Sequence, residues 1–251
     1  MEPRRVLFIF EYLGTRYAGW QRQTNALAIQ QVIEEALEKI TQAPATLIAS
    51  GRTDAGVHAL ALPAHADLAT RIADSELVRA LNALLPEDIV AREARTVSNN
   101  FHARYSALEK TYRYLILNRA IPSAFDHGRV WHFRSPLDVE AMRAAAQRLP
   151  GERDFSSFRS AGCASKQPVR DLSRLTVERQ GDFIVITFTG SGFLKQMARN
   201  ITGTLVDVGR GALNPDDMTR ILAAKDRSAA GPCAPAEGLT LVEVTYPQPT
   251  S

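Results

Sequence analysis

The chain has 251 residues, of which 45% are hydrophobic and 23% are charged, the usage of an ordinary globular protein. This length supplies enough apolar material for the core of one large domain or of two small ones. The formal net charge of +3 is too small to indicate nucleic-acid binding by itself. The places where cations cluster therefore carry more information than their total.

Several classes of protein are disfavoured at once. The N-terminal apolar run stops at Glu11, so it is too short for a signal peptide or a membrane span. The two cysteines, Cys163 and Cys233, form no Cys-x-x-Cys pair, and the five histidines are scattered singly. We therefore expect a soluble, cytoplasmic protein with no metal site, in which a structural disulfide is disfavoured.

Hydrophobic periodicity predicts six elements in the first hundred residues. In chain order they are a strand at 5–13, a helix at 28–40, a short strand at 46–50, a strand at 59–68, a helix at 74–84 with Asp74 as its N-cap, and a strand at 89–97. The order β-α-β-β-α-β is that of a ferredoxin-like fold.

The rest of the chain repeats this theme with larger insertions. We expect a strand at 110–117, a helix at 138–149, strands at 172–179 and 183–189 around a Gln180-Gly181-Asp182 hairpin, helices at 192–208 and 215–224, and a strand at 239–246. The prediction is an α+β protein of two ferredoxin-like (RRM-like) halves, residues 1–105 and 106–251. Their antiparallel sheets would be flanked by helices and would form a central active-site cleft.

Residues 51–59 read GRTDAGVHA and are the most informative stretch of the chain. Arg52 and Asp54 lie two apart, so in an extended segment both side chains leave on the same face. A guanidinium beside a carboxylate keeps that carboxylate ionised. Gly51 and Gly56 bracket the pair and permit close backbone approach. Thr-Asp-Ala-Gly is also good turn chemistry, and as a bare four-residue pattern it favours a turn over a catalytic site.

The longer string resembles the active-site motif of TruA-type tRNA pseudouridine synthases, in which the aspartate is catalytic. Five further blocks resemble that family in the same order, and together they span nearly the whole chain. They are 14–23 (GTRYAGWQRQ), 101–107 with 110–114 (FHARYSA and KTYRY), 154–159 (DFSSFR), 192–200 (GFLKQMARN) and 234–241 (APAEGLTL). The chain departs from the family after His58, where it reads ALALP in place of a Gly-Gln pair. The departure leaves Asp54 untouched and makes the start of the next strand uncertain.

The resemblance implies roles for particular residues. Tyr112 would stack on the target base, a contact worth about 1–3 kcal/mol that needs no particular base. Without the motif, Tyr112 reads as a core strand residue; alternation places Tyr114 on the same face, so that one tyrosine can serve the site while the other packs. Leu241 or its neighbour Leu239 would form an apolar wall. Arg52 would pair with Asp54 and could also fill the gap left by the flipped base.

The chemistry that the resemblance implies needs no cofactor. A stacked uridine must be extruded before a carboxylate can reach its glycosidic bond. One carboxylate fits an isomerisation, whereas glycoside hydrolysis usually calls on two. The same C1′ is separated from nitrogen and rejoined to carbon, so no water needs activation. Attack on the sugar, attack on the base and removal of a sugar proton all remain open as roles of Asp54.

Basic residues elsewhere in the chain are candidates for contacts with RNA. They are Arg22, Arg104, Arg113, Arg159, Lys166, Arg170, Lys195 and Arg199, of which Arg104 and Arg199 are the ones we assign to substrate binding. Lys195 and Arg199 are four apart and would share one helix face, which is equally typical of a solvated face. Trp20 is ambiguous, and Phe155 and Phe158 favour the core.

The prediction is thus a cofactor-independent tRNA pseudouridine synthase. The family resemblance implies the uridines at tRNA positions 38, 39 and 40 in the anticodon stem-loop as substrates, and a homodimer. Two alternatives come from other classes: a non-catalytic RNA-binding module and a nucleoside glycosidase. A basic surface suits the first, but that module needs no Asp54; the second would release free base.

Overall fold

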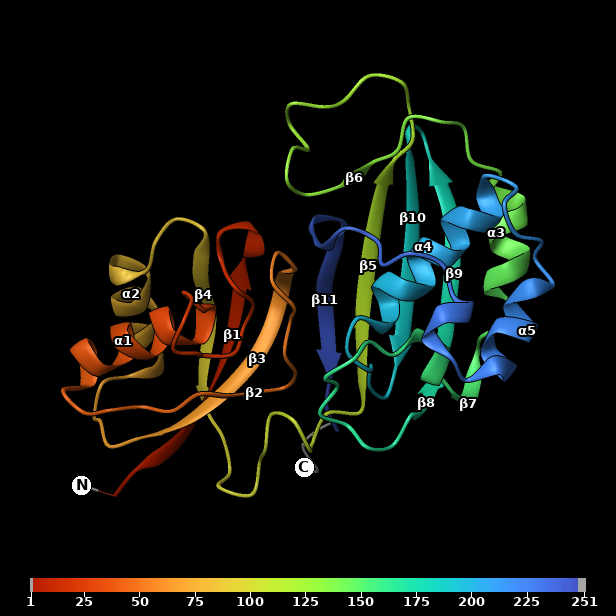
Figure 1. Ribbon diagram of the computed structural model, residues 1–251. Coiled ribbons are helices and arrows are strands. Elements are labelled where there is room, and N and C mark those ends of the chain that lie inside the picture. Colours follow the sequence, from red (N-terminus) through yellow and green to blue (C-terminus); the bar gives the residue numbers. More distant parts are fainter. Residues whose placement is uncertain (1, 248–251) are drawn as a thin grey trace. The chain divides into compact units, whose positions relative to one another are not determined.

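The computed structural model describes residues 2–247 (Figure 1). Backbone contacts divide them into two compact units, a first unit of residues 2–108 with 241–247 and a second unit of residues 109–240. Both units combine helices with antiparallel strands, so the predicted α+β class is confirmed. The division into domains 1–105 and 106–251 stays a prediction.

The first unit follows the β-α-β-β-α-β order. Its elements are β1 (Arg4–Tyr12), α1 (Ile29–Thr41), β2 (Ile48–Ala49), β3 (His58–Leu68), α2 (Asp74–Leu84) and β4 (Ile89–Thr96). A 3-10 turn, η1 (Gly14–Arg16), follows β1. The strands pair in the order β4-β1-β3 with β2 on β3, all antiparallel. This is the pairing that the ferredoxin-like pattern requires.

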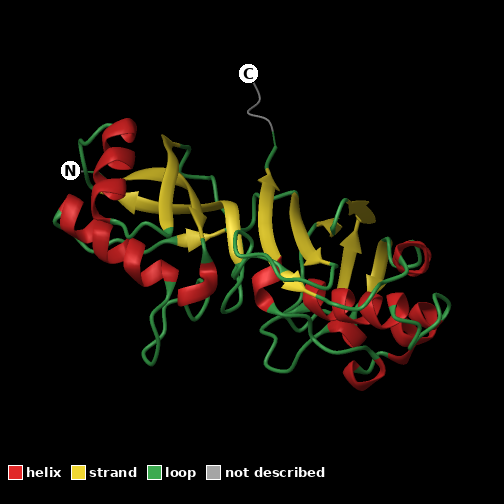
Figure 2. Ribbon diagram, turned by 90° about the horizontal axis from the view of Figure 1, so that it is seen from above, coloured by secondary structure: helices red, strands yellow, loops and turns green. Residues whose placement is uncertain are grey.

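Helices α1 and α2 pack together beside this sheet (Figure 2). The core between these helices and the sheet is built from residues spaced as the sequence pattern predicts. Strand β1 buries Phe8 and Phe10, and α1 buries Ile29, Ile33 and Leu37 at the spacing of one helix face.

The second unit repeats the order with insertions. Its strands are β5 (Glu109–Leu117), β6 (Trp131–His132), β7 (Gly151–Asp154), β8 (Val169–Leu172), β9 (Arg174–Gln180) and β10 (Phe183–Gly190). Its helices are α3 (Val139–Ala146), α4 (Met197–Gly209) and α5 (Asp217–Ala224), with 3-10 turns η2 (Ser156–Phe158), η3 (Arg227–Ala229) and η4 (Ala236–Gly238). The last strand, β11 (Leu239–Thr245), carries residues of both units.

Strands β5, β10 and β9 form the sheet of the second unit in that order. The register pairs Tyr112 with Phe188 and Tyr114 with Ile186, so one face of β5 and β10 is continuous and apolar. Strand β6 adds to β5 in parallel, and β7 with β8 makes a separate two-stranded ribbon. Phe155 and Phe158 are fully buried, which confirms their prediction as core residues.

Most predicted elements differ from the structure at their ends, and three of these differences concern particular residues. The helix expected from residue 192 begins at Met197, because Gln196 has a φ of 60° and cannot continue a right-handed helix. Asp74 is the first residue of α2 and not its N-cap; its carboxylate instead binds Arg4 and accepts from the backbone N–H of Thr96 at 2.7 Å. The strand expected at 172–179 is divided between β8 and β9.

Candidate active site and family membership

Asp54 lies on a tight turn between β2 and β3. The backbone N–H of Val57 donates to the carbonyl of Asp54 at 3.1 Å, and Gly56 holds a φ of 78° inside the turn. Such a φ belongs to the left-handed region that glycine adopts without strain. The Asp54 side chain is half-buried, whereas its neighbour Thr53 is buried. The turn predicted from Thr-Asp-Ala-Gly is therefore present, and it carries the candidate catalytic carboxylate.

Residues 12–20 hold this turn through hydrogen bonds on both sides of Asp54. The hydroxyl groups of Tyr12 and Thr53 lie 2.8 Å apart, and the N–H of Trp20 donates to the carbonyl of Thr53 at 3.1 Å. Beyond the turn, the N–H of Gly14 donates to Nδ1 of His58 at 2.9 Å. Two sequence blocks that resemble one family are thus joined through the backbone next to Asp54.

Two glycines allow that close packing. A Cβ on Gly14 would lie 2.0 Å from the carbonyl oxygen of Val57, and a Cβ on Gly19 would lie 2.7 Å from that of Thr53. Gly19 also has a φ of 95°. Neither position tolerates a side chain without moving the Asp54 turn. Trp20, ambiguous in sequence, is 1% exposed and packs near Phe10 and Tyr12 as a core residue.

A polar network on α1 supports the same region. The Gln30 side chain accepts from Gln21 Nε2 at 2.7 Å and donates to Glu34 at 2.9 Å. Glu34 also accepts from the N–H of Leu47, just before β2, at 2.9 Å. The guanidinium of Arg22 lies 3.2 Å from Glu34. Arg22 is therefore part of this network, and its contact with RNA stays a prediction.

The predicted ion pair between Arg52 and Asp54 is not formed. Arg52 is exposed, and its guanidinium makes no ion pair with any residue in the described range 2–247. The two-residue spacing places side chains on one face only in extended backbone, and here a turn begins at Asp54. The role of Arg52 in the reaction stays a prediction that no longer rests on this pair.

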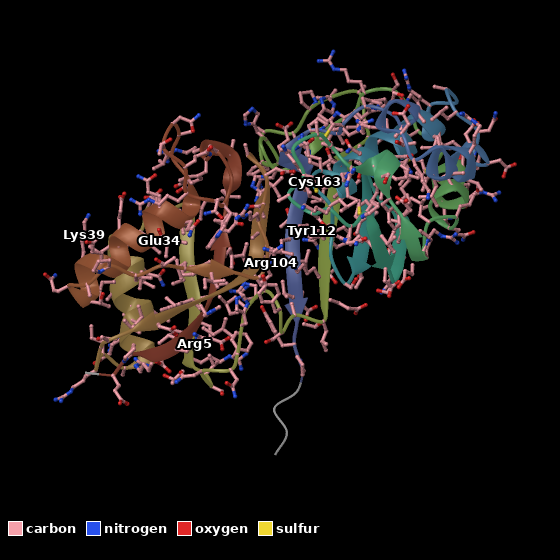
Figure 3. The ribbon with its side chains drawn as sticks, turned by 60° about the horizontal axis from the view of Figure 1, so that its bottom comes forward. Arg5, Glu34, Lys39, Arg104, Tyr112 and Cys163 are labelled. Carbon is pink, nitrogen blue, oxygen red and sulfur yellow. The ribbon has the colours of Figure 1, made fainter. Side chains whose placement is uncertain are left out.

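Tyr112 and Tyr114 divide as the sequence allowed. Tyr114 is fully buried, its hydroxyl donates to the carbonyl of Pro235 at 2.7 Å, and Gly238 leaves room for its ring. Tyr112 is 8% exposed, and its ring meets Phe193 edge-on at 5.0 Å. Tyr114 is a packing residue, and Tyr112, which is labelled in Figure 3, keeps a small part of its side chain exposed on β5.

The other predicted site residues are found in both units. Asp54, Arg52, Arg104 and Leu241 belong to the first unit, and Tyr112 and Arg199 belong to the second. Leu241 and Leu239 are both buried. Arg199 lies on α4, where its Nε donates to the carbonyl of Ala234 at 2.8 Å. Lys195 precedes α4, so it does not share a helix face with Arg199 as predicted.

Arg104 stands beside an exposed aromatic residue that the sequence reasoning did not single out. Tyr105 is 77% exposed, and the Arg104 guanidinium lies 5.7 Å from the centre of its ring. The centre of the Tyr105 ring also lies 4.3 Å from the centre of the His102 ring. A cation beside an open aromatic face suits a nucleobase. The signal in the sequence was the Arg-Tyr pair inside the FHARYSA block.

In residues 2–247, no cluster of three or more His, Cys, Asp or Glu side chains is arranged to hold a metal ion. No helix in the described range has the length and apolar character to cross a membrane.

Comparisons with known proteins agree with these local features. The family model described as tRNA pseudouridine synthase matches residues 8–106 and 145–247. Proteins named tRNA pseudouridine synthase A are similar over nearly their whole length. The relative from Rhodospirillum centenum is 48% identical over 97% of this chain and 100% of its own. Those from Idiomarina loihiensis and a Thermoanaerobacter species are 45% and 43% identical, again over 97% of this chain and over 94% and 100% of theirs.

A solved Cbf5-Nop10-Gar1 complex is similar at a TM-score of 0.35 and 17% identity, over 80% of this chain and 45% of the matched chain. The family match covers both the Asp54 turn and α4, and the relatives are matched almost end to end. The chain belongs to the tRNA pseudouridine synthase family.

Proposed function

We propose that this protein isomerises uridine to pseudouridine in tRNA, at positions 38, 39 and 40 of the anticodon stem-loop. The observation that carries the proposal is the Asp54 turn, held by residues 12–20 in a chain that belongs to this family. The relatives named tRNA pseudouridine synthase A support tRNA as the substrate. The choice of the three positions rests on the resemblance of the sequence blocks.

The proposed reaction breaks the bond from C1′ to N1 of uracil and forms a bond from C1′ to C5, so the substrate is rearranged without loss of atoms. The proton on C5 leaves, and N1 gains a proton. The uridine is extruded from the stem-loop before the reaction, at a cost of a few kcal/mol. Asp54 acts at the C1′ region, and the turn keeps its carboxylate in place before substrate arrives.

Further residues are proposed to bind the extruded nucleotide. Tyr112 stacks on uracil, and Leu241 contributes apolar surface. Arg52, exposed and without an ion pair in the described range, is available to occupy the gap left by the base. Arg104 and Arg199 contact the RNA. The reaction as proposed uses no metal or organic cofactor. A homodimer and a cytoplasmic location are part of the same proposal.

The direct test is Asp54→Asn, which keeps the size of the side chain and removes its charge. Loss of a catalytic group costs typically 100-fold or more in rate, so we expect pseudouridine formation to fall at least about 100-fold while tRNA affinity is retained. Asp182→Asn is the matched control, because Asp182 lies in the β9–β10 hairpin and pairs with Arg119. Full activity of Asp54→Asn would exclude the catalytic role.

The products separate this proposal from its alternatives. An RNA-binding module would bind tRNA and leave every uridine unchanged. A nucleoside glycosidase would release free uracil and would not form pseudouridine. Sedimentation of the purified protein tests the dimer, whose mass would be twice the 27.6 kDa of the chain.

A further inference from the structure

A loop of the second unit is rich in cations. Residues 159–170 (RSAGCASKQPVR), here called the 159–170 loop, end with the first two residues of β8 and contain Arg159, Lys166 and Arg170 and no acidic residue. Lys195, from the turn before α4, joins it by donating to the carbonyl of Ala161 at 3.0 Å. Gly162, next in the chain, lies close under Lys195, because a Cβ built on it would be 3.3 Å from Nζ. Figure 3 labels Cys163, which lies at the middle of this loop.

The cations of the loop bind neutral oxygens. Arg170 donates to the carbonyls of Gln167 at 2.9 Å and Val169 at 2.6 Å, and to Ser165 Oγ at 2.7 Å. Arg159 reaches the carbonyl of Ser165 at 3.5 Å. Within the described residues, Arg159, Arg170 and Lys195 form no ion pair with a carboxylate. Arg159 and Arg170 are nevertheless half-buried.

Other cations of the same unit show the contrast. Arg210 lies 2.9 Å from Asp207, and Arg220 lies 2.9 Å from Asp217. Half-buried charges are normally paired, because removal from water is costly without an opposite charge. Burial lowers the pKa of the Arg170 guanidinium, as expected for a cation that is partly removed from water without a carboxylate beside it. The hydrogen bonds within the loop orient these side chains without neutralising them.

The loop also lies near Tyr112. A Cβ built on Gly192 would be 3.8 Å from Cδ and Nε of Arg170. The next residue, Phe193, meets the Tyr112 ring at 5.0 Å. The cations are therefore connected, through two consecutive residues, to the side chain proposed to stack on uracil.

We propose that Arg159, Arg170 and Lys195 bind a backbone phosphate of the RNA beside the target uridine. This proposal rests on the proposed function, in which the substrate is an RNA. A planar guanidinium matches phosphate with two parallel hydrogen bonds, and an ammonium adds a point charge. Contacts to phosphate position a nucleic acid and carry little base specificity. The three residues are thus positioning residues, which act on binding and register and leave the chemistry to Asp54.

The test compares Arg159→Gln, Arg170→Gln and Lys195→Gln with Arg220→Gln, which removes one positive charge that Asp217 already neutralises. Each of the three substitutions removes a hydrogen bond to a charged phosphate, so KM for tRNA should rise about tenfold in each variant while kcat changes little. In each variant, log affinity should also fall less steeply with log salt concentration, and the size of the slope should decrease by about one. Arg220→Gln should change neither quantity. Thermal unfolding of each variant checks that the loop is still folded.

An altered RNA assigns the effect to a phosphate. In a series of stem-loops, each phosphate that flanks the target uridine is replaced in turn by a neutral methylphosphonate. One of these replacements should weaken binding to the wild-type protein about tenfold and should hardly change binding to the Arg170→Gln variant. Equal losses in both proteins at every position would overturn the proposal, as would KM values no higher than that of Arg220→Gln.

Binding measured directly, without turnover, keeps this result separate from the proposed function. Absence of pseudouridine from wild-type reactions would refute the function. Salt-dependent tRNA binding that depends on Arg170 would still support the phosphate site in that case. If neither pseudouridine nor Arg170-dependent binding is found, both proposals fail.

Discussion

Tyr112 and Tyr114 lie on one face of β5, but only Tyr112 is proposed to stack on the target base, whereas Tyr114 packs in the core. Replacement of Tyr112 by Leu keeps apolar volume and removes the aromatic face. Stacking on a base is worth about 1–3 kcal/mol, so kcat/KM should fall roughly 5- to 150-fold. The measurement is steady-state kinetics on tRNA, with circular dichroism to confirm folding. Unchanged kinetics would exclude stacking by Tyr112.

Tyr114→Phe is the matched control for that experiment. It removes only the hydroxyl that donates to Pro235, leaving a carbonyl without its partner. The free energy of unfolding should fall by about 1–2 kcal/mol, and kcat/KM of the folded protein should stay the same. A large loss of activity here would move the stacking role away from Tyr112.

His65 makes the stability of the first unit sensitive to pH. Burial, with a smaller contribution from the nearby Arg5, lowers the pKa of His65 to about 4 from an ordinary 6.5. Between these values the unfolded chain binds a proton that the folded protein does not, so stability rises with pH across this window and is lost as the pH falls from 6.5 toward 4.

His65→Asn removes this titration and keeps an acceptor for the N–H of Ala103, which donates to His65 Nδ1 at 3.2 Å. Denaturant unfolding from pH 7 to pH 4 should show a shallower decline of the free energy of unfolding in the variant than in the wild type. Parallel declines would show that His65 is not the group responsible.

At the scale of elements, Gly19 is the residue on which the position of the Asp54 turn depends most directly. Gly19→Ala places a methyl group 2.7 Å from the carbonyl oxygen of Thr53 at a φ of 95°. A displacement of about 1 Å can cost about 100-fold in rate, so kcat should fall by about that factor while tRNA affinity is kept.

Gly211→Ala is the control for backbone strain alone. Gly211 has a φ of 77°, and a Cβ there would meet no atom within 4 Å. We expect a loss of stability with little change in kcat. If Gly19→Ala is too unstable to assay, Tyr12→Phe removes the hydroxyl near Thr53 and should lower kcat in a milder way. Equal activities of the two glycine variants would argue against the coupling of residues 12–20 to Asp54.

Helices and strands with strong hydrophobic periodicity could be predicted from the sequence, whereas the segments that connect them could not. The end of α2 at Leu84 follows from the sequence, because its apolar spacing stops there and a proline follows at 86, whereas its start lies one residue before the position that an Asp74 N-cap would give. The start of α4 does not follow from the sequence, because residues 192–196 continue its apolar pattern while Gln196 turns left-handed. Lys195 is consequently separated from Arg199 and joins the 159–170 loop, a contact of 34 residues' separation that no local pattern encodes.

The candidate site shows the same division. Asp54 and its turn could be predicted, because Thr-Asp-Ala-Gly encodes the turn locally and the longer block matches a family. The absence of an ion pair between Arg52 and Asp54 in the described range could not, since it depends on the turn's geometry. The structural role of Arg22 depends on Glu34, which α1 brings to it from twelve residues away.

At the scale of the whole molecule, the first unit has the β-α-β-β-α-β order, and the second repeats its first five elements before β11, which carries residues of both units. In each unit the third strand of this order pairs with the first and the second, as β3 does with β1 and β2, and as β10 does with β5 and β9. The net charge of +3 hides local differences, since the 159–170 loop contains three cations and no acid. Interaction with RNA is therefore expected to depend on particular loops.

The central claim is that Asp54 catalyses isomerisation of uridine in tRNA. Incubation of the purified protein with tRNA labelled in its uridines, followed by nucleoside analysis, tests it most directly. Wild-type protein should form pseudouridine at positions 38, 39 and 40 and release no uracil, and Asp54→Asn should form none above background. Release of free uracil, unchanged uridine with the wild-type protein, or full conversion by Asp54→Asn would contradict the claim.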